Sequence, residues 1–287
     1  RQKERSIIMP LDGTPNLFTL TEELNFELSY EDSKLSGHKF GFNMNTGEAI
    51  SHTRNTFNCV SHPTFFNSVK NVIMDNREPH ELLNAKVKQK TCRNNAWAMV
   101  DITLPNVTYR IYTDKHHTDI SERIILLHGV DGSCSNVALF GGIDMYCTNG
   151  QIRGKYDKVK KKNTSGFSIE TFVSELQTAK ADFDAHCKML QIWAETPIKA
   201  NVRLLLYKIV KSERVSKKMN DIARQEIAKR GKNMYALYSA FTNYSSYADG
   251  RNGFALKNTG NDTRGESMWK REQQVSQWID SKPFQDL

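Results

Sequence analysis

The stretch IILLHGVDGSCSNVALFGGIDMYCTNG, Ile124–Gly150, decides the fold. It opens with a short run of branched apolar side chains, which is typical of a buried strand. The group Val130–Ser133 then supplies turn residues, and the segment after it alternates apolar with polar residues and is too rich in glycine for a helix. We therefore predict two antiparallel strands joined by a turn. Gly141–Gly142 indicates a bulge or a close backbone approach, and Asn149–Gly150 the next turn.

The turn between these strands carries hydrogen-bond donors. The backbone N–H groups of Gly132 and Ser133, with the hydroxyls of Ser133 and Ser135, are suited to hold an anion. A tight turn that only satisfies its own backbone explains the same residues. Both interpretations stay open.

The chain before this stretch predicts more strands and one helix. Period-two alternation predicts strands over Leu24–Tyr30, Ala96–Pro105 and Val107–Thr113, and the segment His38–Val60 contains a hairpin that turns near Asn45–Gly47. His62 and Pro63 begin a short helix whose phenylalanines and valines recur at helical spacing.

The chain after it changes to a helical period. One amphipathic helix is predicted from Ser168 to just before Pro197, a second from near Pro197 to Gly231, and a third over Tyr235–Ala248. The tail predicts a further docked helix. The fold class is therefore α+β, with an antiparallel sheet region in residues 1–150 and a basic helical region in residues 151–287, packed as one unit.

Charge is the strongest signal in the composition of this 287-residue chain, whose formal net charge is +8. The segment Gln151–Arg230 holds eighteen Lys and Arg against nine Asp and Glu, so the rest of the chain is close to neutral. A localised excess of cations favours a polyanionic partner, most often nucleic acid, although a basic surface also serves solubility alone.

The composition also limits the cellular compartments in which we expect this protein. No apolar run approaches the ~20 residues that a membrane span needs, and the five cysteines form no C-x-x-C pair. We expect a protein with reduced thiols and no membrane association, in the cytoplasm. No cofactor motif is present, and no Walker loop, Rossmann glycine pattern or HExxH sequence occurs.

Two motifs carry a family resemblance. DGS, at Asp131–Ser133, followed after an alternating strand by CTNG, at Cys147–Gly150, resembles the HDGSS…CSNG pattern of a phage- and plasmid-type family known as domain of unknown function 932. The likeness extends to Asn45–Val69, Asn94–Pro105 and Tyr235–Tyr247. The family's histidine before DGS is displaced here to His128. The resemblance implies origin in a phage or mobile element of a bacterial host more than a defined activity.

The candidate site combines cations for phosphates with flat rings for bases. We predict a phage-type protein that binds single-stranded nucleic acid, most simply DNA, and protects or anneals it in replication or recombination. Self-association is left open, and no cofactor, metal or catalytic residue is assigned. The predicted contacts come from a basic loop, a later helix and one aromatic helix: Arg153, Lys155, Tyr156, Lys158, Lys160, Lys161, Lys162, Arg203 and Tyr235.

Two other classes remain. A metal-dependent nuclease would use Asp114, His116, His117 and Asp119, although adjacent histidines on an extended chain point to opposite sides. A cysteine nucleophile at Cys147 with His128 as base is a weaker enzymatic hypothesis, because Cys147 alternates in phase with buried strand residues. A non-enzymatic phage structural or host-interaction protein would show neither turnover nor affinity for nucleic acid.

Overall fold

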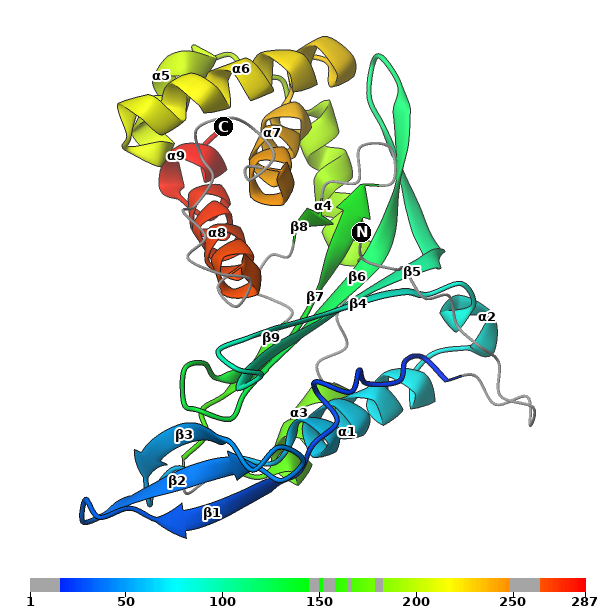
Figure 1. The fold of residues 1–287 in the computed structure, drawn as a ribbon. Coiled ribbons are helices and arrows are strands. Elements are labelled where there is room, and N and C mark those ends of the chain that lie inside the picture. The colour runs from blue at the N-terminus through cyan, green and yellow to red at the C-terminus, as the bar shows by residue number, and fades with distance from the viewer. Residues whose placement is uncertain (1–15, 145–149, 152–157, 165–166, 179–182, 248–263) are drawn as a thin grey trace.

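The computed structural model describes residues 16–144, 150–151, 158–164, 167–178, 183–247 and 264–287. Two antiparallel sheets and two groups of helices make up this part of the chain (Figure 1). The small sheet has the order β1 (Leu28–Asp32), β2 (His38–Asn43) and β3 (Ala49–Arg54). The predicted α+β class is confirmed, with sheets in the first half and helices in the second.

The large sheet is a meander with one divided edge. Its order is β4 (Lys86–Cys92), β5 (Trp97–Tyr112), β6 (His117–Gly129), β7 (Asn136–Asp144) and β8 (Gly150–Gln151). The short strand β9 (Lys158–Lys161) pairs with the beginning of β7, whereas β8 pairs near its end. The sheet therefore extends past residue 150, which corrects the predicted boundary between the two regions.

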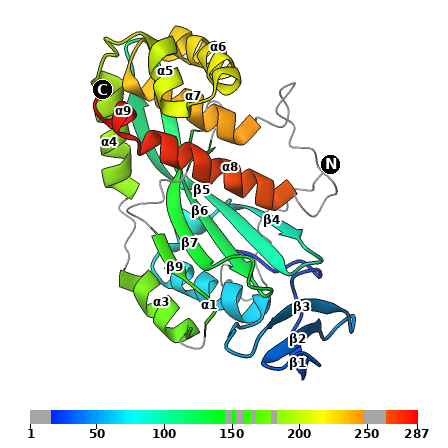
Figure 2. The same cartoon turned by 90° about the vertical axis from the view of Figure 1, so that its left-hand side faces the viewer.

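The helices form two groups, which lie at the two ends of the large sheet (Figures 1 and 2). α1 (His62–Asp75) and α3 (Ile169–Thr178) belong to the end near the small sheet, whereas α2 (Pro79–Leu82) lies beside β5, farther from the small sheet. The other end carries α4 (Phe183–Glu195), α5 (Val202–Val210), α6 (Glu213–Arg230), α7 (Met234–Tyr247), α8 (Arg264–Ile279) and α9 (Lys282–Gln285). Among the described residues, no helix is both long and apolar enough to cross a membrane.

Two predicted helices are each divided in the structure. The helix predicted from Ser168 is α3 and α4, and these belong to different cores: Phe172 packs with α1, and Trp193 packs with α7. The helix predicted from Pro197 breaks at Lys211, which has a left-handed φ of 56° and caps α5. Ser212 then caps α6 by accepting from the Val215 N–H. The predicted end at Gly231 is confirmed.

The strands follow the predicted alternation with two differences. β5 is one strand that includes Pro105, and its pairing with β6 shifts register between Leu104 and Thr108, because proline has no N–H to donate. No bulge interrupts the pairing of Gly141 and Gly142 with β6. Gly142 is instead a close approach, since a Cβ there would lie 2.6 Å from Ile120 Cγ2.

Candidate anion-binding site

A pocket of about 470 Å³ opens where the β6–β7 turn meets the end of β9. The turn contributes Gly132, Ser133 and Ser135, and the residues from β9 onward contribute Lys160, Lys162 and Thr164. α8 adds Lys270 and Gln273 from more than a hundred residues further along the chain. The described residues that line it are Phe57, Trp97, Leu127, Gly132, Ser133, Cys134, Ser135, Val137, Lys160, Lys162, Asn163, Thr164, Lys270 and Gln273.

The turn lines this pocket, but one of the two backbone N–H groups predicted to hold an anion is not available for it. The Ser133 N–H donates to Asp131 Oδ1 at 2.9 Å, so this donor is already engaged. Gly132 has a φ of +78°, a left-handed conformation that glycine adopts at no steric cost. The hydroxyls of Ser133 and Ser135 line the pocket and remain the donors of this turn suited to an anion.

The lysine run is a strand over Lys158–Lys161, which corrects the prediction of a basic loop. In a strand successive side chains point to opposite sides. Lys160 and Lys162 accordingly both line the pocket, while Lys161 Nζ lies 2.5 Å from Glu175 Oε1 in α3. Of these three consecutive lysines, Lys160 and Lys162 therefore line the pocket, and Lys161 forms an ion pair with α3.

Buried amides hold the end of β9 against the hairpin. Asn163 Nδ2 donates to the Gly129 carbonyl at 2.7 Å, and Asn136 Nδ2 donates to Asn163 Oδ1 at 2.5 Å. Both asparagines are buried. This contact places Lys162 beside the turn, because it fixes the residue that follows directly in the chain.

A buried ion network holds α8 on the sheet and so brings Lys270 to the pocket. Arg123 of β6 makes a bidentate contact with Asp101 of β5, at 2.9 and 2.8 Å, and its Nη1 lies 3.0 Å from Glu272 Oε1 of α8. Burial raises the pKa of Glu272 even though Arg123 lowers it. Burial also opposes the charge on Arg123, but the two carboxylates raise its pKa above the ordinary value.

The pocket also has aromatic walls that the sequence did not indicate. Trp97 is 1% exposed and packs in an apolar cluster with Leu127 and Val137, which also line the pocket, so it forms part of the buried wall. Phe57 is half-buried and lies in the connection between β3 and α1. No local pattern marks Phe57 or Lys270, because each joins the site through contacts distant in sequence.

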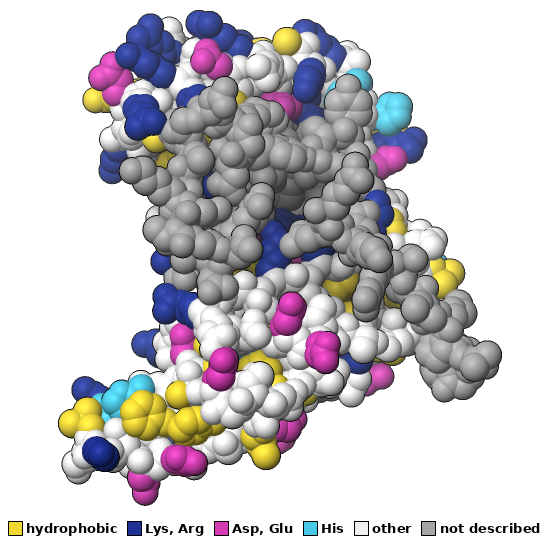
Figure 3. Space-filling view, viewed as in Figure 1, with side chains coloured by type: hydrophobic (Ala, Val, Ile, Leu, Met, Phe, Trp, Pro, Cys, Tyr) yellow, Lys and Arg dark blue, Asp and Glu magenta, His cyan; other side chains and the backbone are white. Residues whose placement is uncertain are grey.

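Of the predicted contacts, Lys160 and Lys162 are the ones that the described structure places in the pocket. Arg153, Lys155 and Tyr156 lie outside the described residues, as does the side chain of Lys158. Arg203 lines a separate open hollow between α5 and α6 with Leu204, Tyr207, Lys217 and Arg224. Lys and Arg side chains gather over this end of the molecule (Figure 3, top). The basic segment is therefore divided between two places.

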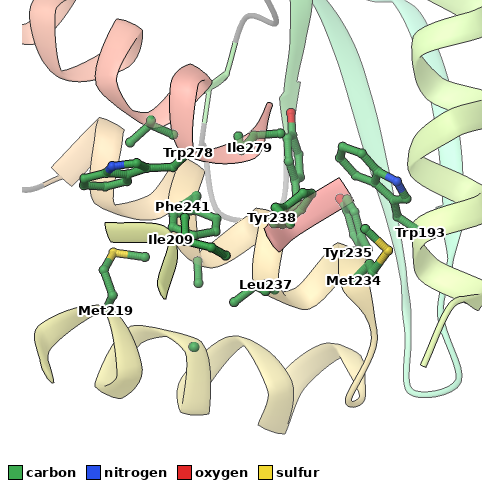
Figure 4. Close-up of a cluster of buried hydrophobic side chains, with 14 of the residues drawn as sticks. Trp193, Ile209, Met219, Met234, Tyr235, Leu237, Tyr238, Phe241, Trp278 and Ile279 are labelled. Carbon is green, nitrogen blue, oxygen red and sulfur yellow. The ribbon is translucent and has the colours of Figure 1, made fainter. Parts of the chain in front are cut away.

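The prediction for Tyr235 is wrong. Its side chain is 1% exposed and packs in the helical core beside Met234 and Trp193, under the Arg230 guanidinium at 5.2 Å (Figure 4). Tyr238 and Tyr244 are buried in the same core. Because the described side chains of α7 from Met234 to Ser245 are all buried, this part of the helix offers no ring to a base.

The residues of the nuclease hypothesis do not form a metal site in the described part of the chain. Asp119 accepts two bonds from Arg110, at 2.7 and 3.1 Å, and the ring of His117 lies against Tyr112. Among the described residues, no group of three or more His, Cys, Asp or Glu is placed to hold an ion. Cys147, the alternative nucleophile, lies outside them.

His128, the base of that alternative, is buried in a pair with His62. Their Nδ1 atoms are 2.7 Å apart, and His62 Nε2 lies 2.8 Å from the Asn95 carbonyl. A carbonyl only accepts, so in the neutral pair His62 carries its proton on Nε2 and accepts from His128 Nδ1. Burial lowers the pKa of His62 to about 4, although the hydrogen bond to the Asn95 carbonyl acts in the opposite direction. Burial, together with the neighbouring His62, lowers the pKa of His128 well below its ordinary value.

This pair predicts instability in acid. Both histidines are neutral when folded and protonate below pH 6.5 when unfolded, so the unfolded state binds more protons between about pH 4 and 6.5. Stability is present above pH 6.5 and falls on acidification, by up to about 1.4 kcal/mol per pH unit for each histidine. Burial raises the pKa of Glu122 to about 7, which contributes in the opposite direction.

A substitution isolates the contribution of the histidines from that of Glu122. His128→Phe fits a ring that already stacks on Phe65, and it is expected to reduce the slope of unfolding free energy against pH by about 1.4 kcal/mol per unit between pH 4.5 and 6. Urea unfolding at several pH values measures this slope. Parallel curves for the variant and the wild type would contradict the assignment.

Comparisons with family models, curated proteins and solved structures find no match to this chain. The likeness to the phage- and plasmid-type family therefore rests on the DGS and CTNG motifs alone and stays a prediction.

Proposed function

We propose that this chain binds single-stranded nucleic acid, with phosphates held in the pocket between the β6–β7 turn, β9 and α8. One observation carries the proposal: among its described lining residues the pocket has three lysines, Lys160, Lys162 and Lys270, with serine and threonine hydroxyls and no carboxylate. Cations and hydroxyl donors in one concave site are the groups that recognise phosphate oxygens. Phe57 adds a ring at the same site.

The role we propose is protection or annealing of single strands in phage-type replication or recombination, in a bacterial cytoplasm. Phosphate contact of this kind is independent of base sequence. The role therefore needs no base readout, and the phage-type origin depends on the motif resemblance.

Fluorescence anisotropy with a labelled strand of about 20 nucleotides tests the proposal, since each neutralised phosphate adds about 0.7 to the slope of log affinity against log salt. We expect affinity to fall steeply as salt rises, with intact oligonucleotide recovered in the presence of magnesium. Affinity that is flat against salt would refute the lysine pocket as the phosphate site. Magnesium-dependent cleavage would favour the nuclease class.

A further inference from the structure

The small sheet presents a row of rings on one face. Residues 38, 40 and 42 of β2 alternate onto the same side, and His52 of β3 is the register partner of Phe40. The Phe40 and His52 rings stack with their centroids 4.3 Å apart and 17° between their planes. The Phe42 ring lies 6.4 Å from that of Phe40, and the His38 ring lies 5.4 Å from that of His52. Phe40, Phe42 and His38 are half-buried and His52 is exposed.

The opposite face of this sheet is occupied by the protein itself. Lys39 lies over the Tyr30 ring at 4.3 Å, and the Tyr30 hydroxyl is 3.0 Å from Cys59 Sγ in the segment that leads to α1. The aromatic face (Phe40, Phe42, His52 and His38) therefore points away from the body. Hydrophobic and histidine side chains gather over β1–β3 on the visible surface (Figure 3, lower left).

A short segment of chain connects this face to the lysine pocket. Arg54 is the last residue of β3 and the register partner of His38. The next residues turn back at once, because the Asn55 N–H donates to the Gly37 carbonyl and the Phe57 N–H donates to the Arg54 carbonyl, each at 2.9 Å. Phe57 already lines the pocket. The row from Phe42 to His38 spans ~13 Å at the usual strand rise, and its His38 end lies at the end of the sheet from which the chain runs to Phe57.

The chemistry of the face suits bases rather than phosphates. Residues 28–54 contain three Lys or Arg and three Asp or Glu, so the small sheet has no excess of cations. Flat rings without net charge bind other flat rings, and every base has such a face when it is unpaired. In a duplex those faces are covered by neighbouring base pairs, so an aromatic sheet face selects single strands.

We propose that the aromatic face is a stacking platform for the unpaired bases of a strand whose phosphates lie in the lysine pocket. This inference rests on the proposed function and adds to it a base-contact site and the reason for a single-strand preference. A strand without bases retains the phosphate contacts and loses the platform contacts, which separates the two sites experimentally.

The test compares a thymine oligonucleotide with an abasic strand of equal length, using anisotropy. The variant Phe40→Leu/Phe42→Leu keeps apolar volume and removes two rings, and Tyr112→Leu, at a ring 60% exposed on β5, is the matched control. Because stacking contributes roughly 5- to 150-fold per base, we expect the double variant to lose at least roughly 10-fold in affinity for the thymine strand. Affinity for the abasic strand and the salt slope should not change.

Each outcome has one meaning. If the double variant keeps its preference for thymine while Lys160→Ala/Lys162→Ala weakens both strands, the platform is wrong and the proposed function stands. If the wild type binds neither strand, both proposals fail. If the double variant only converts a dimer to a monomer in sedimentation, with affinity unchanged, the face is a contact between copies of this chain and the platform is overturned.

Discussion

Replacing Arg123 with alanine is expected to lower the free energy of unfolding by about 3–5 kcal/mol, because the change leaves two buried carboxylates without the guanidinium that they share. The side chains of Arg123, Asp101 and Glu272 are 9, 12 and 10% exposed, so water replaces the guanidinium poorly. Urea unfolding near neutral pH measures the change. A loss of this size is a large part of the stability of an ordinary domain.

The chain provides a matched control for this prediction. Arg110 and Asp119 make the same bidentate contact in the same sheet, but their side chains are 50 and 42% exposed. Arg110→Ala should therefore lower the free energy of unfolding far less than Arg123→Ala does. Equal effects at Arg123 and Arg110 would show that burial of the network contributes little.

A second variant distinguishes anchoring of α8 from stability of the sheet. Glu272→Ala removes the acceptor for Arg123 Nη1 together with a buried charge, while Arg123 keeps Asp101, so we expect a smaller loss of stability than for Arg123→Ala. Oligonucleotide affinity should fall, since Lys270 depends on the position of α8. Unchanged affinity in a folded Glu272→Ala protein would mean that the Arg123–Glu272 contact does not position Lys270.

Replacing Lys160 and Lys162 together with alanine is expected to weaken oligonucleotide binding by roughly 50-fold at about 50 mM salt and roughly 10-fold at about 200 mM. Two phosphate contacts on a single strand account for about 1.4 in the salt slope, so the slope should fall by that amount. Both side chains are exposed, so the thermal midpoint should hardly move.

Lys161→Ala is the internal control for this experiment. It removes the same charge from the same strand, but its Nζ contacts Glu175 and it does not line the pocket. Its effect on affinity should be less than a third of that of either neighbour. Equal losses at all three positions would indicate general charge attraction and would argue against a defined pocket.

The sequence predicted those parts of the fold that local patterns determine. Alternation and turn residues located the β6–β7 hairpin, and His62 with Pro63 located the start of α1, which Ser61 caps in the structure. The break at Lys211 escaped prediction because its left-handed backbone has no glycine to signal it. The break between α3 and α4 escaped it because both helices share one apolar period while packing in different cores.

Only the part of the candidate site that comes from contiguous sequence motifs could be predicted. The lysine run and the DGS turn were both visible, and the pairing of β9 with β7 brings them together. Phe57 and Lys270 reach the pocket through tertiary contacts that no spacing in the sequence records. The prediction that Tyr235 stacks on a base failed because helical periodicity identifies an aromatic side of α7 but does not show whether that side faces solvent. In the structure the side chains from Met234 to Ser245 are buried on every side of the helix.

The position of Lys270 also has a consequence for the timing of activity during translation. Lys162 and Lys270 meet across 108 residues of chain. At typical rates of synthesis that interval takes roughly 5–20 seconds, during which the emerging chain has its turn and its β9 lysines but no α8. Arg123 then has only Asp101 as a partner. If the proposed phosphate site is right, a nascent molecule is therefore expected to bind nucleic acid more weakly until α8 docks and adds Lys270.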